Sequence, residues 1–255
     1  LPSVWENRRV VLRFEGIAGE ADVTVNGSPL GHLAGRGTRR ELDITDAVDF
    51  KRKNLLEVAV SNAAPQAWRP EGRAVKNYGG IFREVYLESI PSTHFRSLVF
   101  RTESISATKA VLAARFEIES DTAGTANIFG EVRGPDGERV AGMQDTIDID
   151  PARPQVFTWK ITVKKPKLWW TEQPEMYSGR ILILTPDLQT DGMGTRFGIR
   201  TFGMSRGAFK LNGQDIYLRG IDRVEDFGPG WGPVQTAKGI EFDVQKMKDG
   251  GFNAV

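Results

Sequence analysis

The chain contains no cysteine among its 255 residues and only two histidines, His32 and His94. Without cysteine it has neither a disulfide framework nor a thiolate metal site, although export from the cell remains open. The two histidines lie far apart in the sequence, so a histidine-rich metal site is not expected. The sequence therefore predicts no bound metal and no cofactor.

Long apolar runs and an excess of one charge are also missing. No segment approaches the roughly 20 apolar residues that span a bilayer, so no membrane partner is expected. The 34 basic residues nearly balance the 33 acidic ones. A nucleic-acid-binding protein usually shows a concentrated basic patch, so no nucleic-acid partner is expected either.

The first residues, Leu1–Glu6, lack the basic region and apolar core of a signal peptide, and their pattern resembles the middle of a domain. Compartment, cytoplasmic or secreted, and assembly into a homo-oligomer stay open.

Short runs of β-branched residues separated by turn residues dominate the first 200 residues and predict a mostly β fold. Asn26-Gly27 is expected to form a tight hairpin turn. Pro91 marks a boundary between an antiparallel sandwich and a second set of strands, whose spacing fits an immunoglobulin-like sandwich. The runs are Val10–Phe14, Ala21–Val25, Leu55–Val60, Ala110–Glu119, Ala126–Arg133, Pro154–Val163 and Gly179–Leu184.

The last fifty or so residues have a different pattern. Two apolar strands flank the hairpin signal Asn212-Gly213, and the second ends at a charged cluster. A helix and a final strand, Phe252–Val255, follow. A strand, a charged loop, a helix and a second strand open a parallel α/β structure. The helix is predicted from a capping residue (Thr236), an apolar stripe (Ile240, Val244, Met247) and a terminating pair (Gly250-Gly251).

Motifs in a consistent order carry a family resemblance. Those of the C-terminal part resemble the entry into the catalytic barrel of glycoside hydrolase family 2, which includes β-galactosidases, β-glucuronidases and β-mannosidases. They are Arg196-Phe-Gly-Ile-Arg, Leu211-Asn-Gly, Leu218-Arg-Gly-Ile-Asp-Arg, Glu225-Asp226, Asp243-Val-Gln-Lys-Met-Lys and Phe252-Asn-Ala-Val. Others resemble the family's jelly-roll sugar-binding domain: Val25-Asn-Gly, Gly31-His, Asp43-Ile-Thr, Asn54-Leu-Leu-Glu-Val and Gly79-Gly-Ile-Phe-Arg-Glu-Val.

The resemblance implies three domains. Residues 1–91 would be a jelly-roll sugar-binding sandwich that is incomplete at its N-terminus. Residues 92–203 would be the immunoglobulin-like β-sandwich, and residues 204–255 the start of a truncated (β/α)8 barrel. A complete barrel needs about 200 residues or more. The chain would thus be a fragment of a longer enzyme.

The implied activity is hydrolysis of terminal β-glycosidic bonds with retention of configuration, on a carbohydrate substrate. The acid/base and nucleophile glutamates are expected on later barrel strands beyond Val255, so the fragment alone is predicted to be inactive. The alternative is a non-catalytic carbohydrate-binding or scaffold protein that kept the architecture.

The candidate substrate pocket lies in the charged loop. Here Asp222, Arg223, Glu225 and Asp226 are expected to hold sugar hydroxyls, joined by Trp231 and Asn77. The alternative is a solvated loop with internal ion pairs. Retaining glycosidases place two carboxyl groups about 5–5.5 Å apart across the scissile bond, a geometry that the adjacent Glu225 and Asp226 do not imply.

Several tryptophans and two departures from the family pattern also bear on sugar binding. The pair Trp169-Trp170 is expected to pack at a domain interface, because neighbouring strand residues point to opposite faces. Stacking on a sugar ring, as in a lectin, is the alternative for these and for Trp68. Many family members carry a histidine where Val224 stands and an aspartate where Ala74 stands. Both replacements remove hydrogen-bond partners from the innermost sugar subsite.

Overall fold

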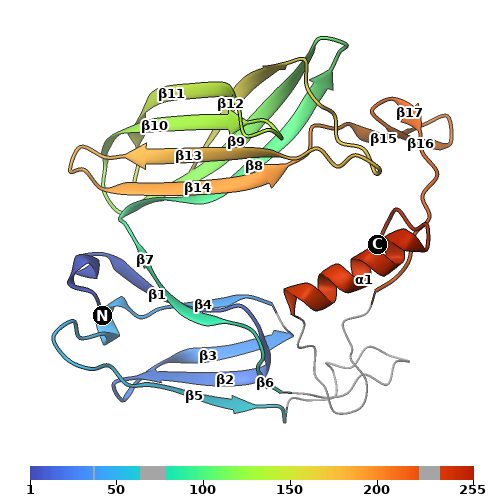
Figure 1. The fold of residues 1–255 in the computed structure, drawn as a ribbon. Coiled ribbons are helices and arrows are strands. Elements are labelled where there is room, and N and C mark those ends of the chain that lie inside the picture. The colour runs from blue at the N-terminus through green and yellow to red at the C-terminus, as the bar shows by residue number, and fades with distance from the viewer. Residues whose placement is uncertain (37, 64–78, 224–235) are drawn as a thin grey trace. The chain divides into compact units, whose positions relative to one another are not determined.

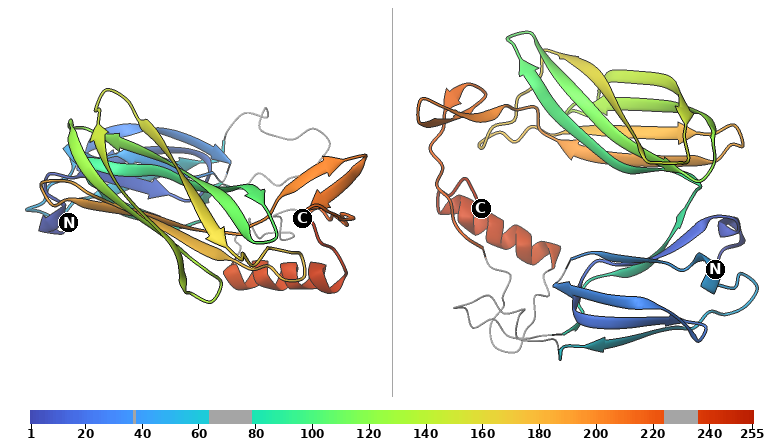
Figure 2. Two further views of the ribbon diagram at one scale, coloured as in Figure 1. Left: turned by 90° about the horizontal axis from the view of Figure 1, so that it is seen from above. Right: turned by 180° about the vertical axis from the view of Figure 1, so that it is seen from behind.

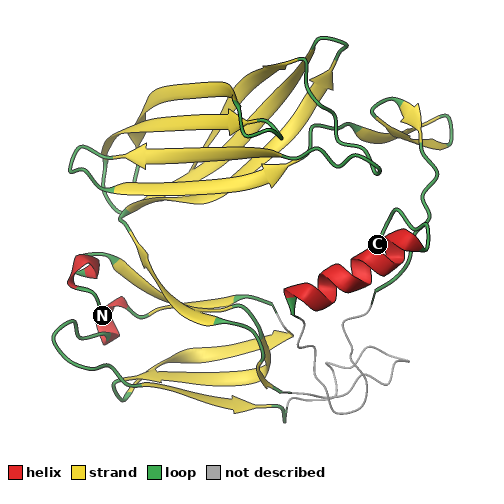
Figure 3. Cartoon of the chain, in the orientation of Figure 1, coloured by secondary structure: helices red, strands yellow, loops and turns green. Residues whose placement is uncertain are grey.

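A computed structural model describes residues 1–36, 38–63, 79–223 and 236–255 (Figure 1). The residues for which predictions were made but which lie outside these ranges are Trp68, Ala74, Asn77, Val224, Glu225, Asp226 and Trp231. The chain divides into two compact units. One unit contains Leu1–Ile90, Ile221–Gly250 and Val255, and the other contains Pro91–Gly220 and Gly251–Ala254. Strands dominate both, so the predicted mostly β class is confirmed (Figure 3).

The first unit contains two antiparallel sheets, in the orders β4-β1-β7 and β3-β2-β5, with β6 paired to β2. Their inward-facing side chains share one core, which includes Val10, Phe14, Ile17 and Val23, each no more than 1% exposed. Two short 3-10 helices, η1 (Ser3–Trp5) and η2 (Thr45–Ala47), accompany them. The strands are β1 (Arg9–Phe14), β2 (Ile17–Val25), β3 (Ser28–Arg36), β4 (Arg40–Asp43), β5 (Leu56–Ser61), β6 (Gly80–Ile81) and β7 (Val85–Ile90).

The second unit contains a two-sheet sandwich, seen from two further sides in Figure 2. One sheet has the order β12-β9-β8 and the other β11-β10-β13-β14, all antiparallel. Alternation is strict on β9, where every second side chain from Ala110 to Ser120 is buried, as a strand with one face in the core requires. The strands are β8 (Thr93–Ile105), β9 (Lys109–Ser120), β10 (Gly124–Arg133), β11 (Arg139–Ile149), β12 (Gln155–Lys164), β13 (Tyr177–Leu184) and β14 (Thr190–Phe197).

A small three-stranded sheet follows the sandwich: β15 (Phe202–Ser205), β16 (Ala208–Leu211) and β17 (Gln214–Asp215). Asn212 and Gly213 turn the chain between β16 and β17 with φ values of 51° and 81°. Asn26 and Gly27 do the same between β2 and β3, with 51° and 79°. Positive φ at both central residues defines the hairpin turn expected of Asn-Gly, so both predicted turns are confirmed.

The predicted helix is present as α1 (Ala237–Asp249). The Thr236 hydroxyl accepts a hydrogen bond from the Gly239 amide at 3.1 Å, which is the capping role expected of it. Gly250 caps the other end, and Gly251 follows with φ of 82°. In the described part of the chain α1 buries none of its side chains. No helix among the described residues is long and apolar enough to cross a bilayer.

Candidate functional site

The charged loop is described as far as Arg223, and this residue is held by the helix that follows it. The Arg223 guanidinium donates from Nε at 3.1 Å and from Nη2 at 2.6 Å to Oδ2 of Asp243 on α1. The Arg223 side chain is only 14% exposed and that of Asp243 32% exposed. Hydrogen bonds between charged groups are the stronger ones in proteins, and here they tie the loop to the helix. Asp222, its neighbour, is exposed.

This contact holds the Arg223 side chain against α1. The structure brings Arg223 together with Asp243, a partner that the sequence analysis did not identify although it lies in one of the family motifs. Of the six pocket residues predicted from the sequence, Asp222 and Arg223 are described, and the grouping of all six stays a prediction.

Asp243→Ala should release α1 from the loop, because it leaves the guanidinium of Arg223 largely buried without this acceptor. We expect the free energy of local opening of α1 to fall by about 1.5–3 kcal/mol, the usual worth of hydrogen bonds to charged groups. Hydrogen exchange of the α1 amides measures it. Glu241→Ala is the matched control, since Glu241 is an exposed acid of the same helix and should change the value by about 0.5 kcal/mol or less. Equal effects of the two variants would show that the Arg223–Asp243 contact does not hold α1 in place.

A second set of hydrogen bonds connects Asn253 to the segment before the charged loop. Its side-chain amide donates to the Tyr217 carbonyl at 3.0 Å, and its Oδ1 accepts from the Arg219 amide at 2.7 Å. The Arg219 side chain in turn donates to the Gly251 carbonyl at 2.6 Å. These bonds align residues 217–220 with residues 251–254, and the two segments form one parallel bridge between Gly220 and Ala254.

The expected barrel strand before the charged loop is therefore shorter than predicted. After the two residues of β17, the described chain as far as Gly220 forms no ladder. The Ile216 amide donates to the Phe209 carbonyl, and the Arg219 carbonyl accepts from the amides of Asn253 and Ala254, in addition to the two bonds of the Asn253 side chain. A parallel bridge does require a crossover between its two segments, and α1 lies in that crossover. The start of a (β/α)8 barrel stays a prediction.

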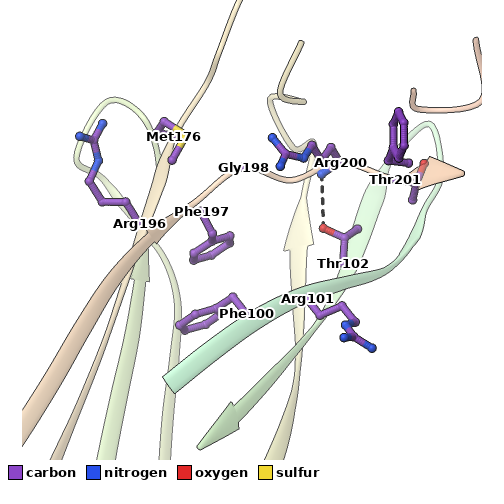
Figure 4. Close-up of a pocket in the computed structure, with 10 residues that line it drawn as sticks. Phe100, Arg101, Thr102, Met176, Arg196, Phe197, Gly198, Arg200 and Thr201 are labelled. Atoms are coloured by element: carbon purple, nitrogen blue, oxygen red, sulfur yellow. Dashed lines mark hydrogen bonds between the residues drawn. The ribbon is translucent and has the colours of Figure 1, made fainter. Parts of the chain in front are cut away.

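A pocket of about 610 Å³ lies at the end of the sandwich where β14 leaves it (Figure 4). The rings of Phe100 and Phe197 stack in it at 4.4 Å, and the Thr102 hydroxyl accepts from the Arg200 amide at 3.3 Å. Figure 4 shows the side chains of Arg101 and Arg196 pointing in different directions. The lining contains no carboxylate, so this pocket has no acid–base pair for glycoside hydrolysis.

Trp169 belongs to the same end of the sandwich. The Arg200 guanidinium lies 4.2 Å from the centre of its ring, and the Trp169 carbonyl accepts from the Asn212 side chain at 3.0 Å. Its backbone amide also donates to the Ile199 carbonyl at 3.0 Å. Trp169 is thus bonded to the segment that joins the sandwich to the small sheet, and Arg200 lies over one face of its ring.

No carboxyl group with a displaced pKa in the described part of the chain is set up as a general acid, which needs a raised pKa. Four show a displaced pKa, and all four are lowered. Arg133 lowers the pKa of Glu131, the Glu138 amide that of Asp136, and the Thr185 hydroxyl that of Asp187. Burial raises the pKa of Asp43, but hydrogen bonds from Thr45 and Arg9 outweigh it. The described residues also contain no cluster of three potential metal ligands.

Comparisons with known proteins connect this geometry to a family. Residues 93–200 match the model described as glycosyl hydrolases family 2. A putative β-glucuronidase of Formosa agariphila is 29% identical over 100% of this chain, and the β-galactosidase BoGH2A of Bacteroides ovatus is 28% identical over 96% of it. The predicted resemblance to glycoside hydrolase family 2 is confirmed. The chain spans 30% and 29% of the length of these two relatives.

Solved structures agree over nearly the whole chain. The Bacteroides uniformis β-glucuronidase 2, solved with cyclophellitol-6-carboxylate aziridine bound covalently, covers 99% of this chain with a TM-score of 0.85 and 28% identity. The chain corresponds to 32% of that structure. A putative β-galactosidase from Bacteroides fragilis has a TM-score of 0.86 at 22% identity and supports the fold alone.

Proposed function

We propose that this chain is the non-catalytic N-terminal part of a retaining family 2 glycoside hydrolase that cleaves terminal β-glycosidic bonds. The observation that supports this most is the match along the whole chain to β-glucuronidases and β-galactosidases, of which it spans about a third or less. The catalytic pair of a retaining enzyme would then lie in sequence beyond Val255.

In this proposal residues 1–91 form the jelly-roll domain, residues 92–203 the immunoglobulin-like sandwich and residues 204–255 the first part of the barrel. The helix α1 supports the last assignment. Ile240 is 41% exposed and Val244 46% exposed, so an apolar stripe of the helix is open in the described part of the chain. Amphipathic helices of a barrel bury such a stripe against its strands. The remaining strands would supply that surface.

Asp222, Glu225 and Asp226, with Trp231 and Asn77, would form the polar rim of the sugar pocket, and Arg223 would hold the loop in place through Asp243. Val224 and Ala74 would face the sugar without hydrogen-bonding groups. A hydroxyl left without a partner costs about 1–3 kcal/mol. The complete protein should therefore act poorly on simple β-galactosides and β-glucuronides, and favour a sugar altered at that hydroxyl or bound through a longer chain.

Val224→His tests this pocket. In the complete protein, we expect the variant to raise kcat/KM for the aryl β-galactoside or β-glucuronide by about 5-fold or more, the equivalent of one restored hydrogen bond. A panel of aryl β-glycosides gives the rates. Val156→His on β12, an exposed valine, is the control and should leave all rates unchanged. The pocket argument fails if the galactoside or glucuronide is already the best substrate and Val224→His does not change its rate.

The departures at Val224 and Ala74 also favour a second candidate, a non-catalytic carbohydrate-binding or scaffold protein. Such a protein would keep the sandwiches and lose the pocket. The two candidates are distinguished by two glutamates on the later strands of the barrel, which the first candidate requires and the second does not.

A further inference from the structure

The outward face of the sheet β11-β10-β13-β14 carries an unusual concentration of arginine. The strand register places Arg139, Arg133 and Arg196 in one row across the sheet, with Ser178 between the last two. Arg180 lies two residues further along β13. These four arginines, all exposed, are called the arginine face.

One carboxylate, Glu131, lies among them and is already engaged. Arg133 donates to both of its oxygens, at 3.0 and 3.2 Å. The charges of Arg139 and Arg180 act on Glu131 as well, since they help to lower its pKa after the larger effect of Arg133. Arg139, Arg180 and Arg196 form no ion pair with any residue in the described ranges. The face therefore keeps an excess of positive charge.

Glycines let long side chains lie flat on this face. A Cβ at Gly142 would overlap Nη2 of Arg139, so the guanidinium lies directly across that residue. A Cβ at Gly192 would come 2.6 Å from a methyl group of Leu182. A groove of about 520 Å³ lies on this face, and its lining includes Arg139, Arg180, Glu131, Phe129 and Leu182.

The groove is lined both by charged side chains and by the apolar side chains of Phe129 and Leu182. Phe129 is 37% exposed and Leu182 46% exposed, and they are paired across the two central strands. Gln144 adds an amide beside Phe129 on β11. An aromatic and an aliphatic side chain suit the C–H face of a sugar ring, an amide suits its hydroxyls, and guanidinium groups bind carboxylates with two parallel hydrogen bonds.

We propose that the arginine face and its groove bind a carboxylated polysaccharide. This rests on the proposed function for the choice of carbohydrate as the ligand. Arg139 and Arg196 lie on the two edge strands, about 14 Å apart at the usual strand spacing. Charges at that separation match an extended polymer with repeated carboxylates, not a single small anion.

The test measures binding of polygalacturonate to the complete protein, with dextran of similar length as the neutral polymer. We expect polygalacturonate to bind in a salt-sensitive manner, and R139Q/R180Q to weaken binding at least about tenfold, because two charge-assisted contacts are lost. The matched control is R101Q/R115Q, which removes two exposed arginines from the opposite sheet and should change the affinity less than about twofold. Phe129→Ala, which keeps every charge, should also weaken binding by several-fold.

The inference is overturned if the wild-type protein does not bind polygalacturonate, as when another part of the protein or a partner covers the face. It is also overturned if both double variants bind alike, or if dextran binds as well as polygalacturonate. Hydrolysis of small neutral aryl β-glycosides should be unaffected by R139Q/R180Q. Failure of binding with intact hydrolysis rejects this site alone, whereas a folded protein that hydrolyses none of them rejects the proposed function.

Discussion

Phe116→Ala should destabilise the protein by about 3–5 kcal/mol, which is a large part of the total stability of an ordinary domain. Phe116 is fully buried at the centre of the sandwich core. Its ring meets Trp159 edge-on at 4.8 Å and Phe95 at 6.0 Å, and it stacks on Phe157 at 5.6 Å. Truncation removes these contacts and leaves a cavity that strands held by ladders on both sides cannot close.

Urea unfolding followed by tryptophan fluorescence measures the loss. Phe129→Ala is the matched control, since it makes the same chemical change on β10 of the opposite sheet but on the outward face, where 37% of the residue is exposed. We expect it to cost about 1 kcal/mol or less. Similar losses for the two variants would contradict the assignment of the inward and outward faces.

Local features of the fold were predictable because short-range chemistry decides them. Asn-Gly pairs adopt positive φ at little cost, which fixed the turns at Asn26-Gly27 and Asn212-Gly213. A threonine followed by an apolar stripe and two glycines located α1. Alternation of buried and exposed residues located strands such as β9.

Features that depend on three-dimensional pairing were not predictable from the sequence. Arg223 and Asp243 are 20 residues apart, and their contact depends on how α1 packs on the loop. The Asn253 side chain bonds the backbone of Tyr217 and Arg219, which lie 36 and 34 residues earlier in the chain. The arginine face depends on the register of four strands, and the sequence around Arg133 or Arg196 does not indicate that register.

The most direct test of the central claim compares the complete protein with residues 1–255 on the same panel of aryl β-glycosides. The account predicts that the complete protein hydrolyses at least one of them and that NMR shows the β-anomer as the first product, as a retaining pair of carboxylates requires. Residues 1–255 should remain at the uncatalysed rate, a loss on the order of 10⁶-fold or more. A folded complete protein that hydrolyses none of the panel would contradict the account. So would turnover by residues 1–255 that Glu225→Gln abolishes.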